Sequence, residues 1–411
     1  MNRTLSVSEA KMRVDNIREM MRNNGFDAVL VGTNANLYYL TGGVFSGYVY
    51  IPAEGEALQF VRRPVDKKGD GIVHIRKPEQ IIEYLGKNGL PAPRKLALEL
   101  DGISYTDALR CQKAFGLESV GNCSPLLAQA RSVKSDFEIS LLRESGAHHC
   151  GSYRRISGLY HEGMTDIELQ IEIERTLRLD GCLGIFRING PSMEMFMGNL
   201  LVGDNADAPS PYDFAMGGEG MDGSLPVGSN GSIILPGNTV MVDMNGNFTG
   251  YMTDMTRTFY VGALDTHAKK AHQLSIDIHH TLIDFIKPGV EAKAAYELAM
   301  DMVEKAGESD FFMGHTQKAG FIGHGVGIEV NEWPVLAPRS RQVFEKGNVI
   351  ALEPKFVIPG VGAVGIENTY VVTDNGLECL TPFPELISSS QKLQINNIFK
   401  NMSDIASAFT Q

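Results

Sequence analysis

Two aspartates in a hairpin-like stretch are the first residues whose types and spacing suggest chemistry. An apolar β-type run over residues 240–244 contains Asp243, passes through Asn and Gly turn residues, and returns to Asp254 eleven positions later. A hairpin centred between Phe248 and Thr249 places the two aspartates directly opposite each other on one face. Two ionised carboxylates this close repel each other unless a cation lies between them. Two alternatives stay open: a solvated hairpin, and a tight turn at residues 245–246 that puts the aspartates out of register.

A second acidic pair occurs nearer the C-terminus. β-rich runs over residues 349–354 and 363–372 flank a Pro-Gly turn signal, and the midpoint between Glu353 and Glu367 falls on the glycine, Gly360. This hairpin places the two glutamates opposite each other inside apolar strands. An unpaired charge on a buried face is strongly unfavourable, so we expect the pair to have a cationic partner.

Between the two acidic pairs lies a histidine flanked by glycines, within residues 320–327. Two Asp, two Glu and one His make an oxygen-rich ligand set with a single imidazole. Such a set suits a pair of divalent ions such as Mn, Co, Fe or Zn. The predicted metal ligands are therefore Asp243, Asp254, His324, Glu353 and Glu367.

The order of these ligands resembles that of the pita-bread metallopeptidases, which include methionine aminopeptidase, aminopeptidase P and prolidase. D-x10-D is followed by GHGxG, then by Glu353-Pro354, then by Ile366-Glu367 and a β-rich run. The likeness extends from about residue 135 to about residue 385. The chain upstream of it, with NLYYLTG at residues 36–42, is similar to the creatinase-type N-terminal domain of prolidase and aminopeptidase P.

The resemblance implies a protein of the α/β (α+β) class with two domains. A creatinase-like α/β domain would occupy residues 1–130, and a pita-bread catalytic domain would occupy residues 131–411. Prolidase relatives also imply a homodimer.

The same resemblance implies a role for each ligand. Asp243 would bind one metal and His324 the other, Asp254 and Glu367 would bridge the two ions, and Glu353 would complete the second site. The ions would lower the pKa of a shared water and polarise the substrate carbonyl. Glu353 would act as general base and then pass the proton to the leaving group. This chemistry suits hydrolysis of an amide bond next to a free N-terminus.

Three positions near the ligands depart from the family pattern. The family histidine about seventeen residues before the first metal aspartate is absent, since residues 223–228 read GSLPVG. A second family histidine corresponds to Asn331, and the prolidase arginine two residues before the last glutamate corresponds to Gly365. Donors beside a developing oxyanion contribute about 10²–10³-fold in rate, so these losses weaken the expectation of efficient Xaa-Pro cleavage. Asn331 is still a hydrogen-bond donor, and His315 is a candidate replacement acid.

A methionine-rich stretch ahead of the first metal strand is the predicted substrate wall. Met195, Phe196 and Asp213, together with Asn331, are the candidate substrate-binding residues. Thioethers and an aromatic ring form an adaptable apolar surface, and ordinary core packing is the alternative. The glycines within residues 217–220 fit a loop that approaches a ligand or turns sharply.

Three functional hypotheses follow. The first is a dinuclear metallo-exopeptidase or dipeptidase of the Xaa-Pro type, acting on short peptides. The second is another metal-dependent reaction on a small molecule, a hydrolase or a lyase like the dimethylsulfoniopropionate-cleaving members of the fold, which the missing histidines and arginine favour. The third is a binding or scaffold protein. Retention of all five ligands argues against the third, because four clustered acids are costly without a cation.

Composition narrows the partners and the compartment. The chain has 411 residues and a formal net charge of −12, which argues against nucleic acid and anionic membranes as partners. Its five cysteines are scattered without CxxC spacing, as expected of free thiols in a reducing compartment. We find neither the apolar core of a signal peptide nor a membrane-length apolar run. The sequence therefore predicts a cytoplasmic protein.

Hydrophobic periodicity predicts the elements that position these residues. In the N-terminal domain we expect helices over 8–25, 78–88 and 105–115, and strands over 26–32, 47–51, 57–61 and 95–99. Of these strands, residues 26–32 read as a buried parallel-type strand. In the second domain we expect helices over 135–160, 165–180, 265–286, 291–306 and 388–411. Capping boxes open the helices that begin near residues 135 and 165, and we expect the histidines on these helices to be structural.

Overall fold

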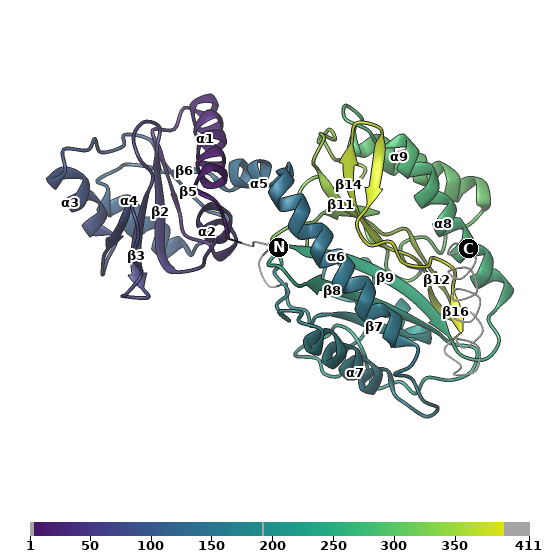
Figure 1. Ribbon diagram of the computed structural model, residues 1–411. Helices are drawn as coiled ribbons and strands as arrows, with labels where there is room; N and C mark the ends of the chain where they lie inside the picture. The colour runs from purple at the N-terminus through teal and green to yellow at the C-terminus, as the bar shows by residue number, and fades with distance from the viewer. Residues whose placement is uncertain (1–3, 191–192, 390–411) are drawn as a thin grey trace, which may run out of the picture. The chain divides into compact units, whose positions relative to one another are not determined.

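The computed structural model describes residues 4–190 and 193–389, and the chain divides into two compact units (Figure 1). The first unit comprises Met1–Phe137 with Arg187–Met193, and the second comprises Glu138–Phe186 with Glu194–Gln411. The expected domain boundary after residue 130 falls inside helix α5 (Ser124–Ser132) of the first unit.

The first unit is built on one six-stranded sheet in the order β4-β3-β2-β1-β5-β6. Its strands are β1 (Ala28–Val31), β2 (Ser46–Pro52), β3 (Leu58–Arg63), β4 (Ile72–His74), β5 (Leu96–Leu98) and β6 (Gly121–Asn122). Its other helices are α1 (Val7–Asn24), α2 (Asn34–Thr41), α3 (Glu79–Lys87) and α4 (Tyr105–Ala114). The helices and strands predicted here are confirmed to within three residues, whereas α2, α5, β4 and β6 were not predicted.

The predicted parallel character of the first strand is only half right. β1 is fully buried and runs parallel to β5, but it runs antiparallel to β2 on its other side. The sheet is therefore mixed. Helix α1 begins where the Ser6 side chain accepts a hydrogen bond from the Glu9 backbone N–H, and it ends at Gly25, whose φ of 69° favours glycine.

The second unit contains two four-stranded sheets, β10-β11-β14-β15 and β16-β9-β8-β7, and a two-stranded sheet, β12-β13. The strands are β7 (Gly198–Val202), β8 (Thr239–Asn247), β9 (Met252–Tyr260), β10 (Gly323–Gly325), β11 (Val349–Leu352), β12 (Lys355–Ile358), β13 (Gly362–Gly365), β14 (Asn368–Thr373), β15 (Gly376–Cys379) and β16 (Ser388–Ser389). The α-helices are α6 (Asp136–Ile156), α7 (Asp166–Leu179), α8 (Thr266–Phe285) and α9 (Ala292–Ala306), with a short 3-10 turn η1 (Gly203–Asp207). The predicted capping box of α7, between Thr165 and Glu168, is present.

Two hydrophobic cores hold the helices against the sheets. α6 and α7 share one core with β7, β8 and β9, and α8 and α9 share another with β11, β12 and β14. Figure 1 shows the two helix pairs on different sides of the strands. The layers between them therefore contain the strands on which the predicted ligands lie.

Side-chain alternation along β8 separates two environments. Val240, Val242 and Met244 pack with α6 and α7, whereas Met241 packs in a small cluster with residues of β12 and β13. Asp243 therefore lies on the face of β8 that is turned away from α6 and α7. The same alternation in β9 turns Asp254 to that face, because Met255 belongs to the core of α6 and α7.

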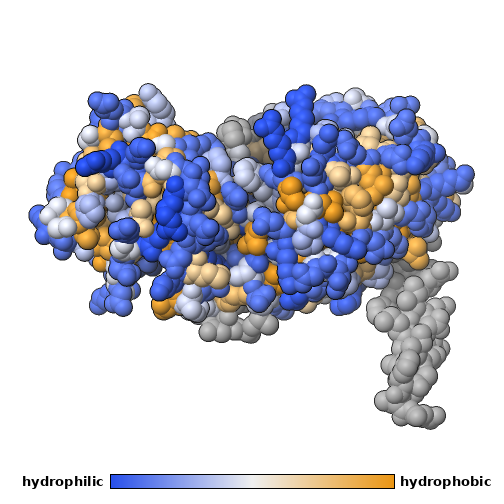
Figure 2. Space-filling model, turned by 90° about the horizontal axis from the view of Figure 1, so that it is seen from above, coloured by the Kyte–Doolittle hydropathy of each residue, from blue (hydrophilic) through white to orange (hydrophobic). Residues whose placement is uncertain are grey.

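The C-terminal helix expected over residues 388–411 is wrong for its first two residues. Ser388 and Ser389 form β16, which pairs in parallel with β9, and residues 390–411 lie outside the described residues. No helix within the described parts of the chain is long and apolar enough to cross a bilayer. On the face drawn in Figure 2, hydrophilic side chains are interspersed with small groups of hydrophobic ones.

Two glycines on α6 provide a matched test of this packing. A Cβ on Gly146 would lie 2.0 Å from the backbone oxygen of Leu380, whereas a Cβ on Gly151 meets nothing within 4 Å. We expect Gly146→Ala to lower the free energy of unfolding by about 2–3 kcal/mol through overpacking. We expect Gly151→Ala to raise it by about 0.5–1 kcal/mol through helix propensity. Urea denaturation of both variants measures the difference, and equal stabilities would contradict the packing described.

Candidate metal centre

Asp243 and Asp254 share one face of the β8–β9 hairpin but are not directly opposite each other. Asp243 pairs with Thr256, and Asp254 pairs with Asn245. The predicted hairpin centre is therefore wrong by one residue, because the loop spans residues 248–251 with Gly250 at φ 91°. The two aspartates are offset by two residues, which is one full side-chain period, so both still point to the same side.

Glu353 and Glu367 meet as the midpoint at Gly360 predicts. β11 pairs Leu352 with Asn368, and the β12–β13 hairpin continues in the same register. Glu353 and Glu367 occupy the position between these two ladders and are therefore opposite each other. Gly360, at φ 76°, supplies the left-handed conformation in the turn.

His324 is held on β10 with its ring oriented by the backbone. β10 pairs with β11, and a Cβ on the neighbouring Gly323 would lie 2.5 Å from the oxygen of Ala351, which explains why a glycine stands there. The Nδ1 atom of His324 is 3.1 Å from the carbonyl oxygen of Gly325. A carbonyl only accepts, so Nδ1 carries a proton, and Nε2, once it has released its own proton, is the nitrogen that would bind a metal ion.

The five predicted ligands come together in two groups. Ligand atoms of Asp254, His324 and Glu367 lie within 4.8 Å of one another, and so do those of Asp243, Glu353 and Glu367. Glu367 belongs to both groups, as a bridging role requires. The Nε2 atom of His324 is also 3.4 Å from Oε1 of Glu353, which links the two groups.

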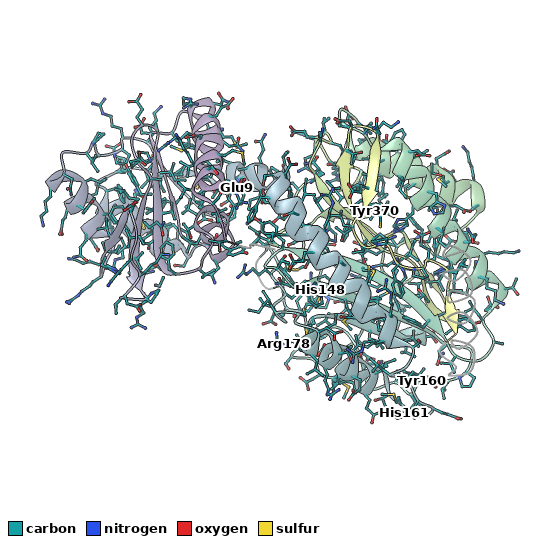
Figure 3. The ribbon with its side chains drawn as sticks, viewed as in Figure 1. Glu9, His148, Tyr160, His161, Arg178 and Tyr370 are labelled. Carbon is teal, nitrogen blue, oxygen red and sulfur yellow. The ribbon has the colours of Figure 1, made fainter. Side chains whose placement is uncertain are left out.

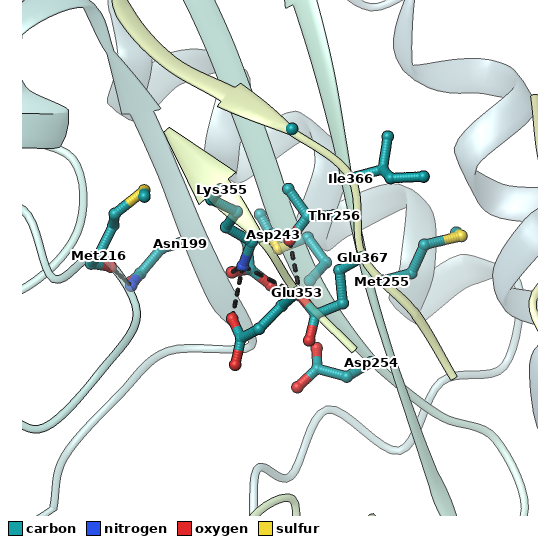
Figure 4. Close-up of polar contacts among 12 residues, drawn as sticks. Asn199, Met216, Asp243, Asp254, Met255, Thr256, Glu353, Lys355, Ile366 and Glu367 are labelled. Atoms are coloured by element: carbon teal, nitrogen blue, oxygen red, sulfur yellow. Dashed lines mark hydrogen bonds and ion pairs between the residues drawn. The ribbon is translucent and has the colours of Figure 1, made fainter. Parts of the chain in front are cut away.

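The second group contains a residue that the sequence analysis missed, Lys355 of β12. Its Nζ lies 2.8 Å from Oδ2 of Asp243, 2.8 Å from Oε2 of Glu353 and 3.1 Å from Oε2 of Glu367 (Figure 4). Burial alone lowers the pKa of this amine, but the three carboxylates raise it well above its ordinary value. Lys355 is therefore an ammonium ion enclosed by three carboxylates.

The ammonium compensates the acids unevenly. Burial raises the pKa of Glu353, but Lys355 and His324 outweigh burial and bring that pKa to about 2. Burial and the negative charge of Glu367 instead raise the pKa of Asp254 well above its ordinary value. The pKa of Glu367 is raised too, chiefly by burial, and its Oε1 is buried without a hydrogen-bond partner. The uncompensated negative charge therefore lies on the side of Asp254 and Glu367.

Two residues of β9 fix the position of Glu367. Thr256 donates a hydrogen bond from Oγ1 to Oε2 of Glu367 at 2.7 Å. The buried guanidinium of Arg257 donates to the backbone oxygen of Glu367 and to Oδ1 of Asn368, both at 2.7 Å. Alternation from Asp254 would have placed Thr256 on the ligand face, so the signal for this residue was present in the sequence.

Asn199 of β7 is a further polar residue beside the ligands that was not predicted. It pairs directly with Asp243 across the β7–β8 ladder. Its Nδ2 donates to the carbonyl oxygen of Met216 at 3.0 Å, and its Oδ1 is buried without a partner. Figure 4 shows Asn199 and Met216 next to the ligand cluster.

The predicted substrate residues lie on segments that lead to these strands. Met195 and Phe196 directly precede β7, and Phe196 is 45% exposed. Asp213 is exposed in the loop before Met216. The bridge between Gly325 and Glu332 brings the segment of Asn331 beside β10. Their roles in substrate binding stay predictions.

His315, the candidate acid, is exposed, and its described contacts are local. Its ring stacks on Phe311 with centroids 5.5 Å apart, and its Nδ1 is 3.3 Å from the backbone oxygen of Asp310. It belongs to neither group of metal-ligating atoms found among the described residues. Its catalytic role stays a prediction.

The helical histidines make packing and hydrogen-bond contacts. His148, labelled on α6 in Figure 3, stacks on Phe248 with centroids 5.4 Å apart. The Nδ1 atom of the buried His279 lies 3.0 Å from the hydroxyl of Tyr370. Neither histidine is in a metal-ligating group of the described chain, in agreement with the structural role expected of them.

Comparison with known proteins identifies the fold and the family. Residues 140–374, more than half of the chain, match the family described as "Metallopeptidase family M24". Residues 13–133 match the family described as "Creatinase/Prolidase N-terminal domain". The chain is 26% identical to the uncharacterized peptidase YqhT of Bacillus subtilis, over 91% of this chain and 99% of that protein. It is 25% identical to the Xaa-Pro dipeptidase of Pyrococcus horikoshii, over 90% of this chain and 96% of that protein.

Among solved structures, the Xaa-Pro dipeptidase from Bacillus anthracis superposes with a TM-score of 0.77 at 24% identity, over 92% of this chain and 99% of that chain. This likeness concerns the fold. Together with the family matches, it confirms the creatinase-type domain and the pita-bread domain expected from the ligand motifs. The chain belongs to metallopeptidase family M24, with a creatinase/prolidase N-terminal domain ahead of its pita-bread catalytic domain.

Proposed function

We propose that this protein is a metal-dependent exopeptidase that hydrolyses short peptides, of the Xaa-Pro dipeptidase or aminopeptidase type. The convergence of Asp254, His324 and Glu367 carries the proposal, because these groups offer ligand atoms within 4.8 Å of one another. The buried, unpartnered Oε1 of Glu367 supports a cation there. The relative from P. horikoshii that is named Xaa-Pro dipeptidase supports the substrate class.

The donor set fits one divalent ion well. Two carboxylates and an imidazole, with the imidazole oriented through its other nitrogen, suit Mn, Co, Fe or Zn. A bound ion supplies a Lewis acid and an acidified water. The second ion implied by the family resemblance would lie beside Asp243, where Lys355 makes its ion pair.

Residues of this chain would carry out proton transfer and substrate binding. Glu353 is kept ionised by the charge of Lys355, so it is able to accept a proton from water and return it to the leaving amine. Its Oε2 is paired with Lys355, and its Oε1, which lies 3.4 Å from Nε2 of His324, becomes free to take the proton when that nitrogen binds a metal ion. Met195 and Phe196 form the apolar wall for the substrate side chain, and Asp213 and Asn331 supply polar contacts.

A second candidate function is a non-peptidase reaction, hydrolytic or eliminating, at the same acidic cluster. Three observations favour it: residues 223–228 contain no histidine, Gly365 stands where prolidases have an arginine, and Lys355 lies among the acids. Each changes the groups that would meet a peptide carbonyl.

We further propose a reducing, cytoplasmic setting and a homodimeric assembly. All five cysteines are free thiols, and four of them are buried, which fits a protein that needs no disulfides. The homodimer is supported by the resemblance to prolidases alone.

Peptide hydrolysis tests the proposed function. Metal-stripped protein, reloaded with Mn, Co, Fe or Zn in turn, is expected to cleave members of a panel of Xaa-Pro and non-proline di- and tripeptides. Glu353→Gln is expected to lower kcat by about 10²–10⁴-fold, because it removes the proton acceptor. Glu378→Gln, at an exposed pair with Arg143, is the matched control and is expected to act like the wild type. Cleavage of no peptide by metal-loaded wild-type protein would exclude the exopeptidase in favour of the second candidate.

The hydrogen bond from Thr256 gives a second test. Thr256→Val keeps the shape but removes the donor to Glu367, and loss of a group that orients a ligand costs about 10–100-fold in metal affinity. Thr258→Val, on the same face of β9, removes a donor to the backbone oxygen of Gly365 and is expected to leave the affinity unchanged. Chelator competition with Mn²⁺ measures both, and an equal effect of the two substitutions would contradict the ligand role of Glu367.

A further inference from the structure

We propose that Lys355 permanently occupies the place of one of the two metal ions, so that the centre binds a single divalent cation among Asp254, His324 and Glu367. The ammonium serves as the fixed second cation. The proposal rests on the proposed function only in requiring that this centre binds a metal at all.

The contacts of Lys355 resemble those of a bound ion. Its Nζ meets carboxylates from three separate segments, at 2.8, 2.8 and 3.1 Å. An ammonium has three protons to donate, and these three oxygens accept all of them. A metal ion bonded to Asp243 and Glu367 would have to take the volume that the ammonium fills.

Lys355 is fully buried in this position. Its side chain is 0% exposed, while those of Glu353 and Glu367 are 4% and 1% exposed and that of Asp243 is 21% exposed. The backbone of Lys355 accepts a hydrogen bond from the N–H of Met313, so both the strand and the side chain are anchored. Displacing the amine would leave a buried charge unpaired, which is far costlier than leaving it in place.

Charge balance supports one ion rather than two. The four carboxylates of Asp243, Asp254, Glu353 and Glu367 carry four negative charges, and Lys355 with one divalent ion supplies three positive charges. A second divalent ion would bring five positive charges against four negative ones and would lie against the ammonium, where like charges repel strongly. The unpartnered Oε1 of Glu367 marks the side on which a cation is still needed.

The strand opposite Lys355 explains why the cation comes from β12. Lys355 pairs with Gly365, the position at which the family resemblance expects an arginine. Gly365 has a φ of 133°, and a Cβ there would lie 2.8 Å from the oxygen of Pro354 and 3.1 Å from Oγ of Ser275. A side chain at residue 365 is therefore strained and crowded.

Metal content and electron paramagnetic resonance of the full-length protein test the proposal. Wild-type protein saturated with Mn²⁺ and freed of excess is expected to hold one Mn per chain, with the six-line spectrum of an isolated ion. Lys355→Ala removes the charge and opens the space, and it is expected to hold two Mn with a spin-coupled spectrum. Lys346→Ala, at an exposed pair with Asp374, is the matched lysine control and is expected to hold one.

Two further variants locate the single ion. His324→Ala is expected to weaken Mn²⁺ binding by at least about 100-fold, since even loss of a supporting group costs about 10–100-fold. Asp243→Asn is expected to retain one Mn, because its carboxylate is paired with Lys355. Equal loss of Mn in both variants would place the ion elsewhere and overturn the proposal.

The outcomes separate this inference from the proposed function, and the wild-type result decides even if Lys355→Ala does not fold. Two Mn per wild-type chain would overturn the single-ion proposal and leave the exopeptidase standing. One Mn per chain without cleavage of any peptide would support the single-ion proposal and overturn the exopeptidase. No bound Mn, Co, Fe or Zn would overturn both.

Discussion

Four carboxylates lie close together in the second unit, and their mutual repulsion is the constraint on which the rest of the structure depends. They come from β8, from β9 and from the ends of β11 and β14, so strands far apart in sequence must converge. A buried cluster of this kind persists only when cations and hydrogen-bond donors surround it. Lys355, His324 and Thr256 meet part of that need, and the divalent ion proposed beside Asp254 and Glu367 would meet the remainder.

The surrounding fold holds this cluster from outside. α6 and α7 pack against one face of β8 and β9, which leaves the other face for the aspartates. Tyr153 of α6 hydrogen-bonds the backbone of both strands, at Met244 and Met255. Arg257 then ties β9 to the backbone of Glu367. These contacts fix ligand positions without using the ligand atoms themselves, so the ligand oxygens stay available for a cation.

The family motifs and hydrophobic periodicity predicted much of this arrangement. The family, both domain types and the convergence of five ligands follow from residues whose spacing is unusual. The Pro-Gly turn gave the register of Glu353 and Glu367 correctly, because a turn signal stands at the midpoint between them. The register of Asp243 was wrong by one residue, because the loop over residues 248–251 is centred between Thr249 and Gly250. The alternative turn at residues 245–246 is wrong too, since Gly246 is not in a turn. It lies inside β8 instead, where a Cβ would come within 2.5 Å of the ring of His149.

Other features depend on contacts that spacing does not reveal. Lys355 stands two residues after Glu353, so alternation predicts a shared face, but only the folded strands bring Asp243 to the same amine. Asn199 is likewise defined by its partner across β7 and β8. The roles of His315 and Asp213 concern exposed loops, and a substrate would define them.

The family alone leaves the number of metal ions and the reaction open, since Lys355, Gly365 and Asn331 all stand at or near the centre. Anomalous diffraction from crystals soaked in Mn²⁺ tests the central claim most directly, because it counts and locates the ions in one measurement. The predicted result is a single anomalous peak among Asp254, His324 and Glu367, with Lys355 still hydrogen-bonded to Asp243. Two peaks with the Lys355 side chain displaced would contradict the account.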